Sequence, residues 1–124
     1  MEVVTYFFDS YAFFELIQGN QNYTPYTEHI AIVTTKLNLM ELHYGLLKRF
    51  NKQVADNYFD ELSQFTIEID DSVFKQASEF RFLHKNKDLS YVDAIGYILS
   101  KMRGIKFLTG DRQFEKLDNV EFVK

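Results

Sequence analysis

Four acidic residues have the types and positions that could share one chemical task, namely Asp9, Glu41, Asp93 and Asp111. Carboxylate oxygens without accompanying histidine or cysteine are the ligands that suit Mg²⁺ or Mn²⁺. Ions held in this way lower the pKa of bound water and stabilise the charge that builds on a phosphate during in-line displacement. The four residue types therefore indicate metal-assisted chemistry on phosphate esters, provided that the fold brings them together.

One helix and one strand link the last two of these acids. Ser90 is a good N-cap for a helix that has Asp93 in its first turn and ends at Gly104. About 14 helical residues carry the chain roughly 20 Å away. The short apolar strand at 105–108, at about 3.3 Å per residue, brings it most of the way back. We therefore expect Asp111, in the turn after this strand, to lie near Asp93.

The other two acids belong to the first half of the chain. The run at 3–8, VVTYFF, is apolar on both faces, which favours a central parallel strand with Asp9 at its carboxyl end. Ser10 is expected to cap the short helix that follows. A second strand at 30–33 leads into a helix at 36–50 that carries Glu41 in its second turn. Ligands bind outside the carboxyl ends of parallel strands, so all four acids are predicted at one sheet edge.

The remaining elements alternate in the same way. We predict a helix at 53–65, a strand at 66–69, a helix from about 72 to 83 and a last strand at 120–123. This alternation predicts an α/β fold with a mainly parallel sheet, and the absence of linkers and repeats predicts one domain over residues 1–124. Apolar residues at helical spacing, expected on the core side, are Leu37, Met40, Tyr44 and Leu47 in one helix and Val73, Phe74, Ala77, Phe80 and Leu83 in another.

Composition excludes several classes of protein. There is no cysteine, which rules out disulfides, zinc–thiolate sites and cysteine nucleophiles. The net charge of −4 argues against a strongly basic nucleic-acid coat protein, but not against an enzyme that reaches nucleic acid through a metal. No apolar run is long enough to span a membrane and no leader pattern precedes the first strand, so we expect a cytoplasmic protein. Two helices rich in aromatic residues, with Phe13, Phe14, Tyr58 and Phe59, are either core or subunit interface.

Each acid also has an ordinary structural explanation. Asp93 suits the first turn of a helix, Asp111 a turn, Asp9 the start of a helix, and Glu41 a solvated helix face. Four independent surface acids that converge on one edge are nevertheless less expected than a site. Among the basic residues, Arg112 is the candidate for contacting a substrate phosphate because it adjoins Asp111.

Three stretches make the chain similar to the PIN-domain ribonucleases, and most of all to the small prokaryotic toxins called VapC. They are VTYFFDSYAFFELI near the start, LNLMELHYGLLK in the middle and DLSYVDAIGYILSKMRGIKFLTGDRQFEKLDNVEFV at the end. Matched residue by residue, the resemblance implies that the family's acidic quartet falls on Asp9, Glu41, Asp93 and Asp111. It also implies that the hydroxyl residue that supports the site is Thr109. Residues 34–36, TTK, differ from the Ser/Thr-rich segment that usually precedes the family's glutamate, which matches Glu41 here.

The resemblance further implies a five-stranded parallel sheet sandwiched by helices. It implies Mg²⁺- or Mn²⁺-dependent RNA cleavage, a homodimer, and inhibition by a cognate antitoxin. We therefore expect a metal-dependent endoribonuclease in which water attacks a phosphodiester. Asp9, Asp93 and Asp111 would hold one or two cations, and Glu41 would complete the metal ligands or position the water.

Two alternatives remain open at this point. The first is a non-catalytic PIN-like module that binds RNA or protein, although such a scaffold has no need for acids that repel one another. The second is a phosphotransfer enzyme or phospho-acceptor domain with an aspartate after its first strand. Hydrolases of that kind carry a second acid two residues on, where this chain has Tyr11. Receiver-type domains need an acidic pair after the first strand, whereas Asp9 is followed by Ser10.

Overall fold

A single parallel sheet forms the centre of the molecule. The computed structural model describes residues 2–124 and places four strands in the sheet in the order β2-β1-β3-β4. All three pairings are parallel, which confirms the predicted α/β architecture. The strands are β1 (Val4–Phe8), β2 (Ile30–Val33), β3 (Lys106–Thr109) and β4 (Val120–Phe122).

The prediction of a fifth strand at 66–69 is wrong for the described chain. This stretch pairs with the sheet only at one parallel bridge, between Thr34 and Thr66. Two backbone hydrogen bonds flank it, from Thr34 to Phe65 and from Ile67 to Thr34. Ile67 and Ile69 pack instead against the core beneath the next helices. The apolar residues of this stretch are therefore explained by their packing against the core and not by pairing with β2.

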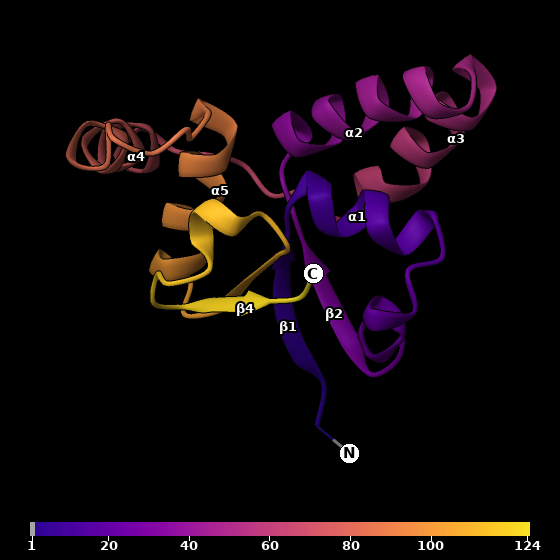
Figure 1. The fold of residues 1–124 in the computed structure, drawn as a ribbon, viewed down its shortest axis with the longest axis horizontal. Coiled ribbons are helices and arrows are strands. Elements are labelled where there is room, and N and C mark those ends of the chain that lie inside the picture. Colours follow the sequence, from indigo (N-terminus) through magenta and orange to yellow (C-terminus); the bar gives the residue numbers. More distant parts are fainter. Residues whose placement is uncertain (1) are drawn as a thin grey trace.

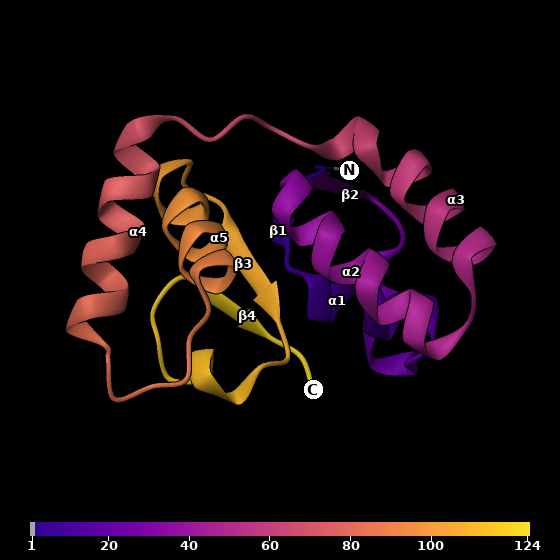
Figure 2. The ribbon, with the colours of Figure 1, turned by 90° about the horizontal axis from the view of Figure 1, so that it is seen from above.

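The helices cover both faces of the sheet. Figure 1 shows α4 and α5 on one side of the strands and α1, α2 and α3 on the other, and Figure 2 shows the same three layers from above. The helices are α1 (Ser10–Ile17), α2 (Lys36–Arg49), α3 (Lys52–Leu62), α4 (Asp71–Leu83) and α5 (Tyr91–Met102). Among residues 2–124, no helix is both long enough and apolar enough to cross a bilayer.

Alternation along the central strands builds two cores. Phe7 and Phe107 stack with ring centroids 5.7 Å apart and belong to the core under α4 and α5. Their neighbours Phe8 and Leu108 belong to the core under α1, α2 and α3. Successive side chains of a strand point to opposite faces, so β1 and β3 each contribute to both cores. This explains why two large apolar residues follow one another in each strand, Phe7 and Phe8 in β1 and Phe107 and Leu108 in β3.

The predicted core stripes of α2 and α4 are partly wrong. In α2 the buried apolar residues are Leu39, Leu42 and Leu46, one helical face away from the predicted stripe. Two apolar stripes at helical spacing occur in this helix, and only its contacts with α1 and α3 decide which one is buried. The predicted core residues that are exposed are Met40, Tyr44, Leu47, Phe74 and Leu83.

The aromatic helices α1 and α3 pack into the core. Phe13 is 3% exposed, and Phe14, Tyr58 and Phe59 pack against the same core cluster on the α1–α3 side of the sheet. Their aromatic side chains therefore serve the interior of this chain. The large apolar side chains left exposed lie mainly on α2 and α4.

Candidate active site

Asp9 lies directly after β1 and caps α1. Its side chain accepts a hydrogen bond from the Ala12 N–H at 2.8 Å, so Asp9, and not Ser10, is the N-cap. The Asp9 backbone N–H donates to the carbonyl of Leu108 in the neighbouring strand at 3.4 Å. The residue is 3% exposed, and its carboxyl group lies against the hydroxyl of Thr109 at the end of β3. A buried carboxyl group at the end of a central strand is where a ligand site of a parallel sheet is expected.

The turn after β3 holds the second predicted acid. Asp111 caps a single 3₁₀ turn at 112–114 through a hydrogen bond from the Gln113 N–H to its Oδ1 at 2.9 Å. Its own backbone N–H donates to the Thr109 hydroxyl at 3.1 Å. Thr109 is fully buried, and its hydroxyl also lies against the Asp9 carboxyl group. One hydroxyl therefore contacts both strand-end acids, while the role of Thr109 as a support of the site stays a prediction.

Asp93 lies at the start of α5, as predicted. Its Oδ2 accepts from the Ser90 backbone N–H, and its own N–H donates to the Ser90 Oγ, each at 3.0 Å. This reciprocal capping box fixes the first turn of the helix. Figure 2 shows β3 lying alongside α5 with its carboxyl end toward the end at which α5 begins. The chain runs away from the site along α5 and returns along β3, as estimated from the lengths of the helix and the strand.

Glu41 reaches the site from α2. Its Oε1 accepts a hydrogen bond of 2.5 Å from the hydroxyl of Ser10, the residue that follows Asp9. The bond joins the first turn of α1 to the second turn of α2 and makes Ser10 a contact that the sequence reasoning missed. An apolar cavity of about 580 Å³ lies between α1 and α2, and Ser10 and Glu41 are among its lining residues.

Burial and mutual repulsion act on the Asp9 carboxyl group. Burial is the largest cause and raises its pKa to about 8. The charges of Asp93 and Asp111 act in the same direction. Hydrogen bonds from Thr109 and Ala12 oppose the rise in pKa without cancelling it. Asp9 therefore holds a proton at neutral pH unless another positive charge takes its place.

The pKa of Asp93 is raised in the same way. The pKa is raised to about 6, mostly by burial and also by the charges of Glu41 and Asp111. The hydrogen bonds within the capping box with Ser90 act against this rise. The charge of Asp111 thus acts on both Asp9 and Asp93, and the charge of Glu41 acts on Asp93, although the four acids come from four different parts of the chain. The fold brings them to one edge of the sheet.

The donor set suits a hard cation, but the acids do not form a ready-made metal cage. Within residues 2–124, no group of three or more histidine or acidic side chains is arranged so that it could hold a metal ion. Each of the four carboxylates has one oxygen engaged by a chain donor. In Glu41, Asp93 and Asp111 the second carboxylate oxygen accepts no hydrogen bond from any donor in residues 2–124. The chemistry of the free oxygens therefore fits Mg²⁺ or Mn²⁺.

Arg112 is exposed beside the acids. Its guanidinium lies 3.7 Å from the Glu115 carboxylate in a surface ion pair. Such exposed pairs are weak, at about 0–1 kcal/mol, so a substrate phosphate can compete for this side chain. Its position next to Asp111 agrees with the expectation from the sequence, while its role as a substrate contact stays a prediction.

The sequence profile of the PIN domain family matches residues 6–120, nearly the whole chain. The chain belongs to the PIN domain family. The four acids and Thr109 lie within the matched range. No curated protein matches the sequence significantly.

Solved structures share the fold of this PIN domain. VapC20 of Mycobacterium tuberculosis, a toxin that cleaves the sarcin–ricin loop, matches with a TM-score of 0.81 and 19% identity over 96% of this chain and 99% of that one. A toxin–antitoxin complex from Klebsiella pneumoniae matches at 0.74 and 20% identity over 93% and 94%. VapBC2 from Rickettsia felis, bound to a DNA fragment from its promoter, matches at 0.72 and 15% identity over 98% and 100%. At these identities the likeness concerns the fold.

Proposed function

We propose that this PIN domain is a metal-dependent endoribonuclease that cleaves RNA phosphodiesters and acts as the toxin of a toxin–antitoxin pair. The observation that carries the proposal is the raised pKa of the buried Asp9, to which acids from the α5 start and the β3 turn contribute. Shifts of this kind, produced by burial together with specific charges, mark candidate functional sites. Family membership and the fold shared with VapC toxins support the same reading.

In the proposed mechanism, Asp9, Asp93 and Asp111 are the residues that would hold one or two Mg²⁺ or Mn²⁺ ions. The bound metal would supply water of lowered pKa and neutralise charge on the phosphate. As a ligand Asp9 would release its proton to solvent, because ligating carboxylates are ionised. Ser10 fixes Glu41 through Oε1 and leaves Oε2 free to accept a proton from the attacking water. The water oxygen would then bond to phosphorus as the bond to the leaving ribose oxygen breaks, and that ribose oxygen would take up a proton from solvent.

Other parts of the proposal concern the protein around the site. Thr109 orients Asp9 and Asp111, and Arg112 contacts a substrate phosphate after leaving Glu115. We propose that residues 1–124 act as one nuclease domain, in a cytoplasmic homodimer held inactive by a cognate antitoxin. Sedimentation velocity of the purified chain tests the dimer directly, since a monomer at all concentrations would contradict it.

A second candidate is a PIN-like module that binds RNA or protein without cleaving it. One observation favours this alternative, because the acids in residues 2–124 are not arranged as a metal cage. The two candidates differ in whether metal binding and cleavage occur at all, so one experiment separates them.

The decisive experiment is cleavage of a mixed pool of structured and single-stranded RNA with Mg²⁺, Mn²⁺ or EDTA. The variants are Asp9→Asn and Asp93→Asn. Asparagine keeps the N-cap hydrogen bond of Asp9 and cannot ionise to bind a metal, so α1 is expected to remain folded. The exposed Asp60→Asn on α3 is the matched control for the loss of one negative charge.

We expect cleavage that requires metal, falls at least 100-fold in both site variants and is unchanged in Asp60→Asn. Full activity of Asp9→Asn would overturn the site assignment. Absence of cleavage together with absence of metal binding in calorimetry would favour the non-catalytic module.

A further inference from the structure

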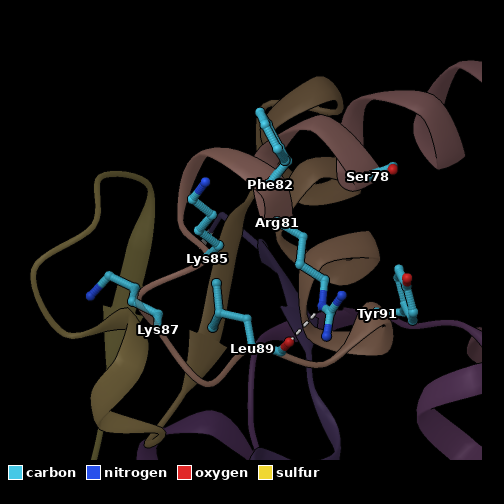
Figure 3. Close-up of a pocket in the computed structure, with 7 residues that line it drawn as sticks. All are labelled: Ser78, Arg81, Phe82, Lys85, Lys87, Leu89 and Tyr91. Carbon is cyan, nitrogen blue, oxygen red and sulfur yellow. Dashed lines mark hydrogen bonds between the residues drawn. The ribbon is translucent and has the colours of Figure 1, made fainter.

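A second concave site lies outside the acidic edge. It is formed where the end of α4 meets the loop that leads into α5, and its volume is about 320 Å³ (Figure 3). We call it the α4–α5 pocket and define it by the residues that matter for its chemistry. These are Arg81, Phe82, Lys85, Lys87 and Tyr91.

Arg81 holds the wall of this pocket in place. Its Nε donates a hydrogen bond of 2.8 Å to the carbonyl of Leu89, which Figure 3 marks with a dashed line. Its guanidinium carbon lies 4.2 Å from the centroid of the Tyr91 ring. The side chain is therefore fixed by the loop on one side and by the aromatic ring on the other. A fixed cation loses little further freedom when it binds an anion.

The pocket is positively charged in a chain that is negative overall. Arg81, Lys85 and Lys87 all line it, and no acidic residue does so. None of these three cations forms an ion pair with another side chain among residues 2–124. The net charge of the whole chain is −4, so this concentration of unpaired positive charge is a local feature. It favours an anionic ligand with several charges.

Two aromatic side chains accompany the cations. Tyr91 is 63% exposed and Phe82 is 67% exposed, values that are high for such large rings. Lys85 lies 5.0 Å from the centre of the Phe82 ring. Exposed aromatic rings beside a track of positive charge are the combination that binds single-stranded nucleic acid, because bases stack on the rings and phosphates meet the cations.

Short contacts connect this pocket to the acidic site. Asp88, in the loop that lines the pocket, donates its backbone N–H to the Gln113 Oε1 at 3.3 Å. The Gln113 backbone N–H in turn donates to Asp111 at 2.9 Å. On the other side of the loop, Tyr91 begins α5 only two residues before Asp93. One strand of RNA can therefore contact both places.

We propose that the α4–α5 pocket binds the nucleotides of single-stranded RNA that adjoin the cleaved phosphodiester. Tyr91 and Phe82 stack on bases, while Arg81, Lys85 and Lys87 contact phosphates. The inference rests on the proposed ribonuclease function and adds a substrate-binding region to it. It also explains how an acidic chain holds a polyanion, since Arg81, Lys85 and Lys87 place positive charge beside the acidic site.

The test compares RNA binding by variants that keep Arg81 and its hydrogen bond to the Leu89 carbonyl. Arg81 is kept because it holds the loop. Lys85→Ala with Lys87→Ala removes two charges, and Lys75→Ala with Lys106→Ala is the matched control, since both of those lysines are exposed outside the pocket. Tyr91→Ala removes the ring and Tyr91→Phe retains it. Binding of a fluorescent single-stranded oligoribonucleotide is followed by anisotropy in EDTA over a range of salt concentrations.

We expect Lys85→Ala with Lys87→Ala to weaken binding about 10-fold or more and to reduce the slope of log affinity against log salt by about 1.4. Tyr91→Ala is expected to weaken binding at least about 5-fold, with recovery in Tyr91→Phe. In cleavage assays the same changes raise KM and leave kcat near its original value. The control pair is expected to behave like the unmodified protein in all of these measurements.

The outcomes separate this inference from the proposed function. Unchanged binding and KM in the pocket variants, with cleavage intact, would overturn the pocket and leave the ribonuclease standing. Pocket-dependent binding by a chain that cleaves no RNA would overturn the ribonuclease and leave the pocket standing. Equal competition by polyphosphate and by RNA, with no effect of Tyr91→Ala, would reduce the site to a place for anions alone and overturn base stacking.

Discussion

At the scale of single residues, the fold raises the pKa of the Asp9 carboxyl group. The Asp9 carboxyl group caps α1 and accepts hydrogen bonds from two donors, and its pKa is nevertheless about 8. Burial and the charges of Asp93 and Asp111 outweigh the donors Ala12 and Thr109. A group held in this state gains more from a nearby cation than an exposed carboxylate would.

The raised pKa has a direct consequence for stability in the absence of metal. The native state keeps a proton on Asp9 between the unfolded pKa of about 4 and the folded pKa of about 8, while the unfolded state has released it. Stability from this group is therefore fully present below about pH 4 and is lost as pH rises through about 8. In EDTA we expect the free energy of unfolding to fall by up to about 1.4 kcal/mol per pH unit across this window.

Urea unfolding of the wild type and of Asp9→Asn between pH 5 and pH 8.5 measures this effect. The difference between the two proteins isolates Asp9, since the remaining titrating groups are common to both. The difference is expected to change with pH in favour of Asn at high pH. A constant difference over the window would show that the Asp9 pKa is not raised.

At the scale of elements, the turn after β3 depends on a glycine that has no room for a side chain. A Cβ placed on Gly110 would overlap the ring of Tyr11 and the carbonyl oxygen of Val123. The turn thus lies directly between α1 and the chain that follows β4. This packing determines where the next residue, Asp111, lies relative to Asp9.

Gly110→Ala is therefore expected to cost about 1–3 kcal/mol of stability, as overpacking does, and to reduce cleavage more than its effect on folding explains. Gly45→Ala is the matched contrast, since its Cβ would meet only the side chain of Phe14, at 3.3 Å, and alanine favours the helix by up to about 1 kcal/mol. Thermal melts and cleavage rates below the melting temperature measure both quantities. Equal stability of the two variants would contradict the packing argument.

At the scale of the whole molecule, the sheet joins the two cores into one unit. Phe107 contacts Phe7, Tyr97 and Phe114 on the α4–α5 side, and its neighbour Leu108 faces the α1–α3 side. A substitution that loosens packing on one face of the central strands is therefore expected to destabilise the core on the other face. We expect both cores to unfold in one transition.

Phe107→Ala is expected to lower the free energy of unfolding by about 3–5 kcal/mol. NMR methyl signals of Leu42 on one side and Leu99 on the other are expected to disappear at the same urea concentration. The exposed Phe82→Ala is the control and should change stability by less than about 0.5 kcal/mol. Separate midpoints for the two signals would show that the cores unfold independently.

Much of this architecture could be predicted where local chemistry decides the outcome. The Ser90 cap, the end of α5 at a glycine with φ of +68° and the apolar strands that precede Asp9 and Asp111 follow from residue preferences close in sequence. The parallel α/β arrangement follows from alternation. The Asp9 cap was misassigned by one residue, because Asp and Ser are both good caps and stand side by side.

Predictions failed where a choice depended on distant partners. The stretch at 66–69 has the pattern of a strand, yet two isoleucines pack against the α4–α5 core and leave one bridge to the sheet. The α2 helix has two apolar stripes, and its contacts with α1 and α3 select the one through Leu42. The residues close by in sequence decide neither whether 66–69 pairs as a strand nor which stripe of α2 is buried.

The sequence by itself determined the Ser90 cap, the end of α5 and the apolar strands that precede Asp9 and Asp111, since caps, turns and periodicity act over a few residues. Only the tertiary structure decided how deeply Asp9 is buried, that Ser10 holds Glu41, and that Gln113 ties the loop of the α4–α5 pocket to Asp111. Those features join residues up to 31 positions apart. Their strength depends on burial and on neighbouring charges, which exist only once the chain has folded.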